Sequence, residues 1–255
     1  MDINFLQHSD EKCIFVIEGI SPAIANTIRR LVIDEVPALA IDTVTVSKNS
    51  SAMYDEMLAH RLGLIPLITD LKSYARKEEC KCEGKGCASC QLVLSLKAEG
   101  PATVYSEEIK SKDKAVKPVY GKMPVTKLAK GQEVDVACIA VLGSGKQHAK
   151  FSPGLIFYQG VPEFSVESGS KVPVCDIHKS LVSGSKAMKS SDKDRCMLCF
   201  DYDRKGITSI PSKESFMFTL ESWGQLTCKE ILHAAVDAME SKLDSFDKQL
   251  KKLKF

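Results

Sequence analysis

Alternating apolar and polar positions mark several strands along this chain. Leu92, Leu94, Leu96 and Ala98 occupy every second position, which is the period of a strand with one buried face. Other short runs are rich in β-branched or aromatic residues and are bounded by turn-forming residues. The pattern predicts strands at 13–17, 44–46, 92–98, 134–142 and 215–220.

Helical spacing replaces this alternation after the first strand. Ser21 is a good N-cap, and Pro22 suits the first helical position, where its missing N–H is not needed. The apolar residues at helical spacing are Ile24, Ile28, Leu31 and Val32, and Pro37 stops the run. A second helix is expected at 53–62, with Gly63 as a left-handed C-terminal cap.

The C-terminal segment predicts the longest helix. Thr227 and Glu230 have the spacing of a capping box, in which each side chain bonds the other residue's backbone N–H. Apolar residues then recur in steps of four and three, at Leu232, Val236, Met239, Leu243, Phe246, Leu250 and Leu253. This heptad spacing is typical of a helix that packs lengthwise against another helix.

The predicted helix continues to Phe255 and is about 40 Å long, which exceeds what a small domain readily covers. Its far end is therefore expected to meet another chain. The alternative is that this helix packs against the helix predicted at 22–36 of the same chain. Both interpretations hold if the two helices together form one interface.

Composition and charge narrow the class of protein. The chain has 255 residues, of which 44% are hydrophobic and 27% charged, so it is expected to fold as one or two globular domains with a small appendage. A formal charge of +2 argues against a protein whose entire surface attracts nucleic acid. The lysine-rich segment 106–131 is predicted to be a solvated excursion. Without an evident signal peptide or long apolar stretch, we expect a soluble, cytoplasmic protein that has no membrane partner.

Cysteine spacing supplies the candidate chemistry. Cys80, Cys82, Cys87 and Cys90 offer four thiolates within a short loop, which suits tetrahedral zinc. Such a site is closed to water and would be structural, with free or redox-active thiols as the alternative. Cys13, Cys138 and Cys228 lack such neighbours and are predicted to be small buried hydrophobes.

A second group has weaker metal-binding spacing. It consists of Cys175, His178, Cys196 and Cys199. These residues favour zinc over an iron–sulfur cluster, because Tyr202 stands where a cluster run would continue with cysteine. An insert without metal is the third possibility.

The chemistry that is absent from the sequence favours a binding or scaffolding protein. No nucleophile elbow, zinc-protease motif or phosphate-binding glycine loop is present. The alternatives are an iron–sulfur electron carrier built on the second cysteine group and a stand-alone zinc protein that binds nucleic acid.

Four segments resemble a known family. They are 26–42, 55–67, 148–153 and the capped C-terminal helix. They are similar to the alpha-like subunit of archaeal DNA-directed RNA polymerase, which is the homologue of the third-largest subunit of polymerase II and of bacterial alpha. The resemblance implies an α+β fold. An alpha-subunit-like dimerisation domain would comprise 1–46 and 205–255, an inserted α/β domain with the zinc loop 47–164, and a small ferredoxin-like metal-site insert 165–204.

The resemblance also implies a function in assembly. The family's member pairs with the small subunit L and recruits the second-largest subunit and subunits N and P, without catalysing nucleotidyl transfer. DNA contact would then be indirect, through the complex. Arg29 and Arg30 are solvated surface residues by periodicity alone, but the resemblance places them at the docking surface for the large subunit. It likewise implies zinc at Cys80, Cys82, Cys87 and Cys90, and an iron–sulfur cluster in the insert, which Tyr202 argues against.

Overall fold

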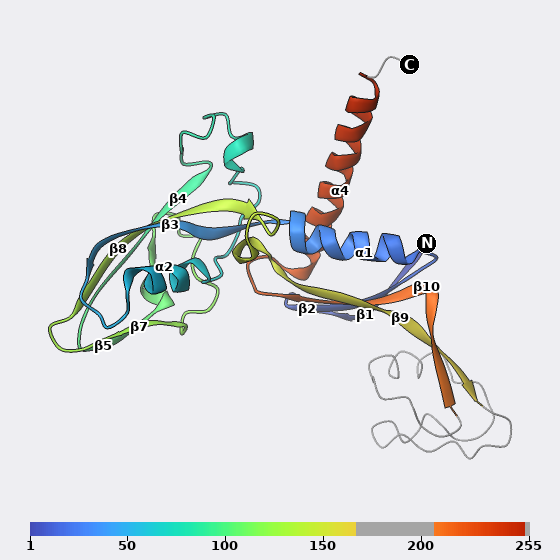
Figure 1. Cartoon of the computed structure of the whole chain (residues 1–255), viewed down its shortest axis with the longest axis horizontal. Coiled ribbons are helices and arrows are strands. Elements are labelled where there is room, and N and C mark those ends of the chain that lie inside the picture. Colours follow the sequence, from blue (N-terminus) through green and yellow to red (C-terminus); the bar gives the residue numbers. More distant parts are fainter. Residues whose placement is uncertain (167–206, 253–255) are drawn as a thin grey trace. The chain divides into compact units, whose positions relative to one another are not determined.

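The computed structural model describes residues 1–166 and 207–252 (Figure 1). It shows the mixed α and β composition that the sequence predicts, with antiparallel sheets. The chain forms two compact units. The first comprises Met1–His8, Lys12–Thr27 and Phe157–Thr219, and the second comprises Ser9–Glu11, Ile28–Ile156 and Leu220–Phe255. The domain boundaries expected from the resemblance stay a prediction.

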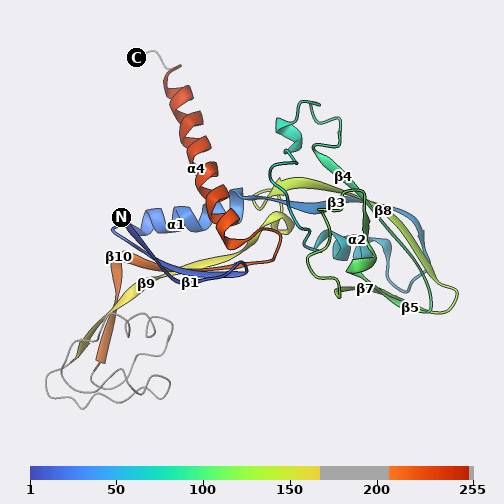
Figure 2. The same ribbon diagram turned by 180° about the vertical axis from the view of Figure 1, so that it is seen from behind.

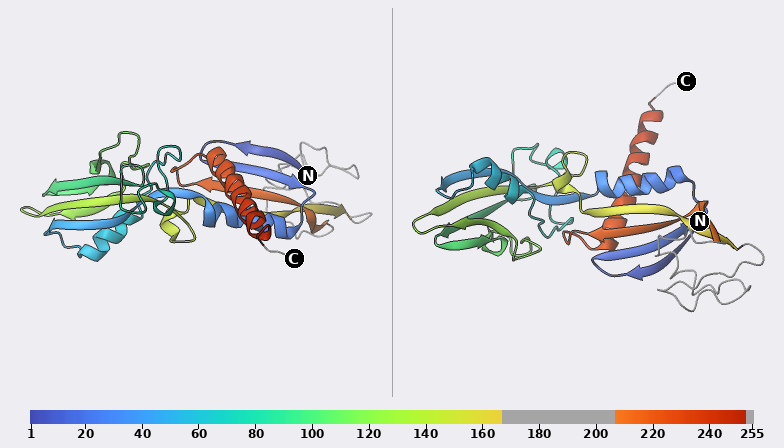
Figure 3. Two further views of the ribbon diagram at one scale, coloured as in Figure 1. Left: turned by 90° about the horizontal axis from the view of Figure 1, so that it is seen from above. Right: turned by 60° about the horizontal axis from the view of Figure 1, so that its bottom comes forward.

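The first unit is built on a four-stranded sheet with the order β1-β2-β10-β9 (Figure 3). The strands are β1 (Asp2–His8), β2 (Lys12–Glu18), β9 (Gly154–Val166) and β10 (Ile207–Ser222), and the ends of β9 and β10 continue into the second unit. The Phe15 ring stacks on Phe218 at 5.1 Å between centroids. Ile14, Val16 and Met217 form a separate buried cluster. The strands predicted at 13–17 and 215–220 are therefore confirmed.

The second unit holds the larger core. Its sheet has the order β3-β8-β4-β6, made of β3 (Pro37–Asn49), β8 (Glu133–Ser144), β4 (Gln91–Glu99) and β6 (Lys110–Ser111). A second sheet pairs β5 (Ala102–Tyr105) with β7 (Pro124–Leu128), and helix α2 (Asp55–Gly63) contacts both β3 and β7. Buried residues of the core include Leu39, Ile41, Leu58, Leu62, Leu94 and Leu96. Short 3-10 helices lie at Lys77–Glu79 (η2), Ser106–Glu108 (η3) and Ala149–Phe151 (η4).

The strands predicted for this unit are confirmed, but the lysine-rich segment is not a solvated excursion. Burial alternates along β4 as predicted, and β8 contains 134–142. Segment 106–131 keeps its lysines exposed, yet it contributes β6 and β7 and buries apolar side chains in the core. The apolar residues of this segment that belong to the core are Ile109, Val116, Val125 and Leu128. The prediction was wrong because the apolar residues of this segment are irregularly spaced among the lysines, so they show neither a strand nor a helix period.

The predicted cap at Gly63 is also wrong. Gly63 belongs to α2, and its φ angle is not positive. The helix ends at Gly63, and its C-cap is Leu64, whose backbone N–H bonds the His60 carbonyl at 3.2 Å and closes the last turn. The capping bonds are thus made one residue later, where no left-handed conformation is required.

The helix predicted at 22–36 divides into two kinds of helix. Helix α1 (Pro22–Arg30) is followed by the π-helix η1 (Leu31–Glu35), in which the Val36 N–H bonds the Leu31 carbonyl at 3.2 Å. Ser21 is the predicted N-cap, because its Oγ accepts from the Ile24 N–H. The predicted apolar stripe is partly wrong. Leu31 and Val32 are buried, but Ala25 is buried in α1 whereas Ile24 is 45% exposed.

Helix α4 (Cys228–Leu250) is the longest helix of the described residues. Its capping box is confirmed: the Thr227 Oγ accepts from the Glu230 N–H at 3.3 Å, and the Glu230 carboxylate accepts from the Thr227 N–H at 2.8 Å. The helix ends at Leu250 and not at Phe255. A 3-10-type hydrogen bond follows the helix, from the Lys252 N–H to the Gln249 carbonyl three residues back. Residues 253–255 lie outside the described part.

Candidate metal centre and exposed helix seam

The cysteine loop forms a compact turn before β4. A backbone bond of 2.9 Å from Ala75 N–H to the Ser89 carbonyl closes its base. Glu83, Gly84 and Gly86 have positive φ angles of 53°, 78° and 86°. These left-handed residues reverse the chain sharply, and Gly adopts that conformation without steric cost. The local sequence thereby folds the four cysteines toward one point.

The four sulfurs fit a tetrahedral metal ion. All ligand atoms of Cys80, Cys82, Cys87 and Cys90 lie within 4.8 Å of one another. The Sγ–Sγ distances are 3.4 Å for Cys80–Cys87, 3.5 Å for Cys80–Cys82, 3.6 Å for Cys82–Cys90 and 3.9 Å for Cys87–Cys90. A tetrahedron with Zn–S bonds of about 2.3 Å has sulfurs about 3.8 Å apart. The group therefore has the size of a zinc site, and four sulfur ligands leave no position for a reacting water.

Mutual hydrogen bonds separate the pKa values of these thiols. The side-chain hydrogen bond between Cys80 and Cys82 is the largest cause that lowers the pKa of Cys82, to about 6. At Cys80, the backbone hydrogen bond with Cys82 lowers the pKa, but side-chain hydrogen bonds with Cys87 and Cys82 outweigh it and raise the pKa to about 12. The backbone hydrogen bond with Ser89 is the largest cause that lowers the pKa of Cys87, and burial raises the pKa of Cys90. Two thiolates are thus stabilised at the expense of the other two. A divalent cation removes this conflict because it stabilises all four thiolates together.

The remaining cysteines of the described chain behave as predicted. Cys13, Cys138 and Cys228 are buried. Burial raises the pKa of the Cys138 thiol to about 11 and also raises the pKa of Cys13. The thiols of Cys13 and Cys138 therefore stay protonated, and all three buried cysteines pack as small apolar groups. The candidate ligands Cys175, His178, Cys196 and Cys199 lie outside the described residues.

Helix α4 presents an apolar seam that is not covered by the described residues. Its buried face comprises Cys228, Ile231 and Ala235, which lie in the first turns. The seam occupies a neighbouring face: Val236, Leu243 and Phe246 are 56%, 57% and 61% exposed. Met239 and Leu250 are also exposed, Leu232 is partly buried, and Leu253 lies outside the described residues. Figures 1 and 2 show the C-terminal half of α4 clear of the other elements of the second unit.

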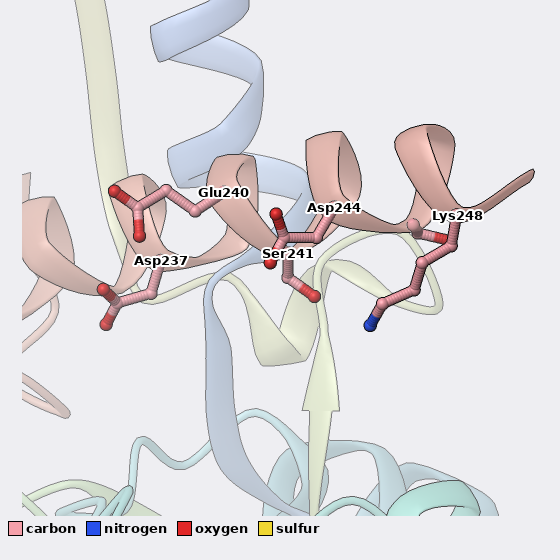
Figure 4. A pocket seen from close by; sticks show the side chains of 6 residues that line it. Asp237, Glu240, Ser241, Asp244 and Lys248 are labelled. Carbon is pink, nitrogen blue, oxygen red and sulfur yellow. The ribbon is translucent and has the colours of Figure 1, made fainter. Parts of the chain in front are cut away.

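A hollow on the polar face of α4 does not form a binding site. Its lining residues are Asp237, Glu240, Ser241, Asp244, Ser245 and Lys248 (Figure 4). All of them belong to one helix, so the hollow has no second wall and encloses no ligand. It shows instead that α4 has a charged face distinct from the apolar seam.

The arginine pair lies at the end of α1. Arg30 is exposed, and its Nε is 3.4 Å from the Asp34 carboxylate one turn further on. Arg29 is partly buried. An exposed ion pair of this type contributes little to stability, so the Arg30–Asp34 pair adds little to the fold.

Three residues near these sites were not predicted from the sequence. Glu35, Arg76 and Lys242 join η1 to the cysteine loop and to α4. Arg76 Nη2 donates to the Glu35 carbonyl at 2.8 Å, and Lys242 Nζ lies 2.6 Å from the Glu35 carboxylate. No periodicity or motif distinguishes them, because each is an ordinary polar residue in its own segment.

Comparisons with known proteins define first the class and then the family. Residues 40–157 match the family model described as the RNA polymerase Rpb3/RpoA insert domain, and this range includes α2, the cysteine loop and most of the β3-β8-β4-β6 sheet. The described residues contain no helix that is long and apolar enough to cross a membrane.

Relatives extend the similarity over nearly the whole chain, and each is called DNA-directed RNA polymerase subunit Rpo3. The relative from Methanosarcina acetivorans is 36% identical, and the match covers 96% of each chain. Those from Archaeoglobus fulgidus and Pyrococcus furiosus are 33% and 32% identical, with coverage of 99% of this chain and 98% of each relative. The chain belongs to the Rpo3 family of archaeal RNA polymerase subunits, which confirms the resemblance found in the sequence.

Proposed function

We propose that this chain is a non-catalytic subunit of DNA-directed RNA polymerase, a nucleotidyltransferase, and that it is the platform on which other subunits assemble. The observation that carries the proposal is the exposed heptad seam of α4 in a member of the Rpo3 family. The stand-alone metal proteins considered from the sequence are set aside, because near full-length similarity links this chain to polymerase subunits.

The seam supports a protein partner rather than a small ligand. Residues of the seam are spaced for knobs-into-holes packing, and the charged face of the same helix points elsewhere. Burying a large apolar side chain contributes roughly 1.5 to 3 kcal/mol, so a few of them provide substantial binding energy. The partner that we propose is the small subunit L, and the pair then recruits the second-largest subunit and subunits N and P.

The remaining sites have supporting roles in this proposal. One zinc ion is held by Cys80, Cys82, Cys87 and Cys90 and fixes the chain entering β4, because Gln91 directly follows the last ligand. Arg29 and Arg30 contact the second-largest subunit. DNA is contacted only through the complex, whose expected compartment is the cytoplasm. Any metal at Cys175, His178, Cys196 and Cys199 is more consistent with zinc than with an iron–sulfur cluster.

Charge insertion into the seam tests the platform role. Leu243→Lys combined with Phe246→Lys should lower affinity for subunit L more than 100-fold, because two buried apolar contacts are replaced by unpaired charges. Affinity is measured by titrating purified L. The matched control is Ser241→Lys with Ser245→Lys, which adds the same charge to the opposite face of α4 and should leave affinity within about twofold. Unchanged binding by the seam variant would refute the proposal.

A further inference from the structure

The π-helix η1 lies where three structural features of the second unit meet. Its Glu35 carbonyl accepts from Arg76, and its Asp34 carbonyl accepts from the Lys146 N–H at 3.0 Å. Gly145 also passes close to η1, because a Cβ there would overlap the Ile33 carbonyl. Backbone positions of η1 are therefore fixed by bonds from the cysteine-loop segment and from the turn after β8.

Arg76 belongs to the base of the cysteine loop. It lies next to Ala75, whose backbone bond to Ser89 closes that base, and four residues before Cys80. A second bond joins the same regions: Gln147 Nε2 donates to the Glu78 carboxylate at 3.4 Å. The Arg76 guanidinium thus donates to the Glu35 carbonyl from the folded base of the loop, and metal binding at the cysteines stabilises that fold.

Glu35 transmits this constraint to α4. Its carboxylate is 17% exposed and lies 2.6 Å from Lys242 Nζ, whereas its carbonyl holds Arg76. Among the bonds of the described residues, Glu35–Lys242 is the one farthest along α4 that joins the helix to another element. The buried face ends at Ala235, so this ion pair restrains the helix beyond its apolar base, within the seam between Met239 and Leu243.

We infer that Arg76 and Glu35 are positioning residues that couple metal binding in the cysteine loop to presentation of the α4 seam. Folding of the loop around a divalent metal fixes Arg76, Arg76 fixes η1 through the Glu35 carbonyl, and the Glu35 carboxylate holds α4 at Lys242. The partner-binding half of this inference rests on the proposed function. The intramolecular half does not.

Coupling through a few polar contacts should be modest. An exposed ion pair contributes about 0.2 to 1 kcal/mol, which corresponds to a change of up to about fivefold in an equilibrium constant. We therefore expect zinc removal to change the opening equilibrium of α4 by about fivefold. By thermodynamic reciprocity, a partner bound to α4 must tighten zinc binding by the same factor as zinc tightens partner binding.

Hydrogen exchange on the full chain tests the intramolecular step. Removing zinc with a chelator should speed amide exchange in α4 residues 236–246 about fivefold. Arg76→Ala should give this faster exchange even with zinc bound, and removing zinc should then have no additional effect. Lys242→Met should do the same without altering the loop. The control is Lys72→Ala, which removes an exposed charge from the same segment and should leave the zinc response intact. If Arg76→Ala with zinc exchanges like the wild type, the inference is overturned.

Binding measurements extend the test to the partner. Subunit L should bind the zinc-loaded wild type about fivefold more tightly than the zinc-free protein, and this ratio should fall to one in Arg76→Ala. Arg76→Lys, which keeps a cationic donor, should recover part of it. Faster exchange in Arg76→Ala without any binding of L would uphold the intramolecular coupling and refute the proposed partner. Binding of L with a zinc ratio of one in the wild type would refute the coupling and uphold the partner.

Discussion

The cysteine loop and helix α4 are both incomplete in the isolated chain, but in different ways. The loop supplies every ligand of a tetrahedral site, and its sulfurs are already spaced for the metal. The helix carries an apolar seam that stays exposed among the described residues. A site of the first type requires an ion, whereas the second type requires a surface of matching shape. The comparison explains why one segment is stabilised locally and the other is suited to assembly.

Loss of one zinc ligand should have the largest effect of the predictions that follow. Cys87→Ser should reduce bound zinc from one per chain to near zero. With free zinc at about 100 times its dissociation constant, binding stabilises the folded protein by about 3 kcal/mol. The melting temperature should therefore fall by about 6 to 12 °C, measured by calorimetry with metal analysis. Ser89→Ala changes an exposed residue of the same loop and is the control. A zinc-free protein that melts at the wild-type temperature would contradict the structural role.

Charge reversal at the arginine pair should separate the two interfaces. Arg29→Glu with Arg30→Glu should leave binding of subunit L unchanged and prevent the pair from recruiting the second-largest subunit, because an interface charge facing its own sign costs several kcal/mol. The control reverses two exposed lysines elsewhere, Lys112→Glu with Lys114→Glu. Recruitment of the large subunit at wild-type level in a pull-down would show that the arginines are ordinary surface residues.

Removing the hydrogen bond of Tyr74 should have a smaller effect, confined to the stability of the second unit. The Tyr74 hydroxyl donates to the Asp113 carboxylate at 2.8 Å and joins the lysine-rich segment to the core. Burial and this bond raise the pKa of Tyr74 to about 12. Tyr74→Phe should lower the free energy of unfolding by about 1 to 2 kcal/mol at pH 7.

The pH dependence of the Tyr74→Phe effect has a defined sign. Because the folded pKa exceeds the ordinary value of about 10, the neutral phenol stabilises the fold fully below pH 10, and this contribution is lost as the pH rises toward 12. Urea unfolding at pH 7 and pH 11 should show a narrower gap between variant and wild type at pH 11. A gap independent of pH would contradict the assigned hydrogen bond.

The metal content of the second cysteine group can be tested on the unaltered protein, and the result sharpens the comparison of metal sites. With Cys175, Cys196 and Cys199 as thiols and Tyr202 in place of a further cysteine, we expect no iron–sulfur cluster. Protein purified without oxygen should be colourless and show no absorption near 400 nm. A brown protein with about three or four irons per chain would show that His178 or another group completes a cluster.

Local patterns of sequence predicted what neighbouring residues determine by themselves. Thr227 and Glu230 form the expected capping box, and the cysteine spacing predicted the group that the fold assembles. The link through Glu35 was not predictable, since Arg76 lies 41 and Lys242 lies 207 residues away along the chain. The apolar residues of the lysine-rich segment likewise lie in a core that they share with residues distant in sequence, such as Leu39 and Leu94, so their burial cannot be read from the segment alone.

The stoichiometry of the complex with subunit L tests the platform role most directly. Light scattering during size-exclusion chromatography should show the chain alone as self-associated or poorly soluble, because the α4 seam is exposed. Addition of L should give a single species containing one copy of each chain, to which the second-largest subunit then binds. A chain that remains monomeric and does not combine with L would contradict the account.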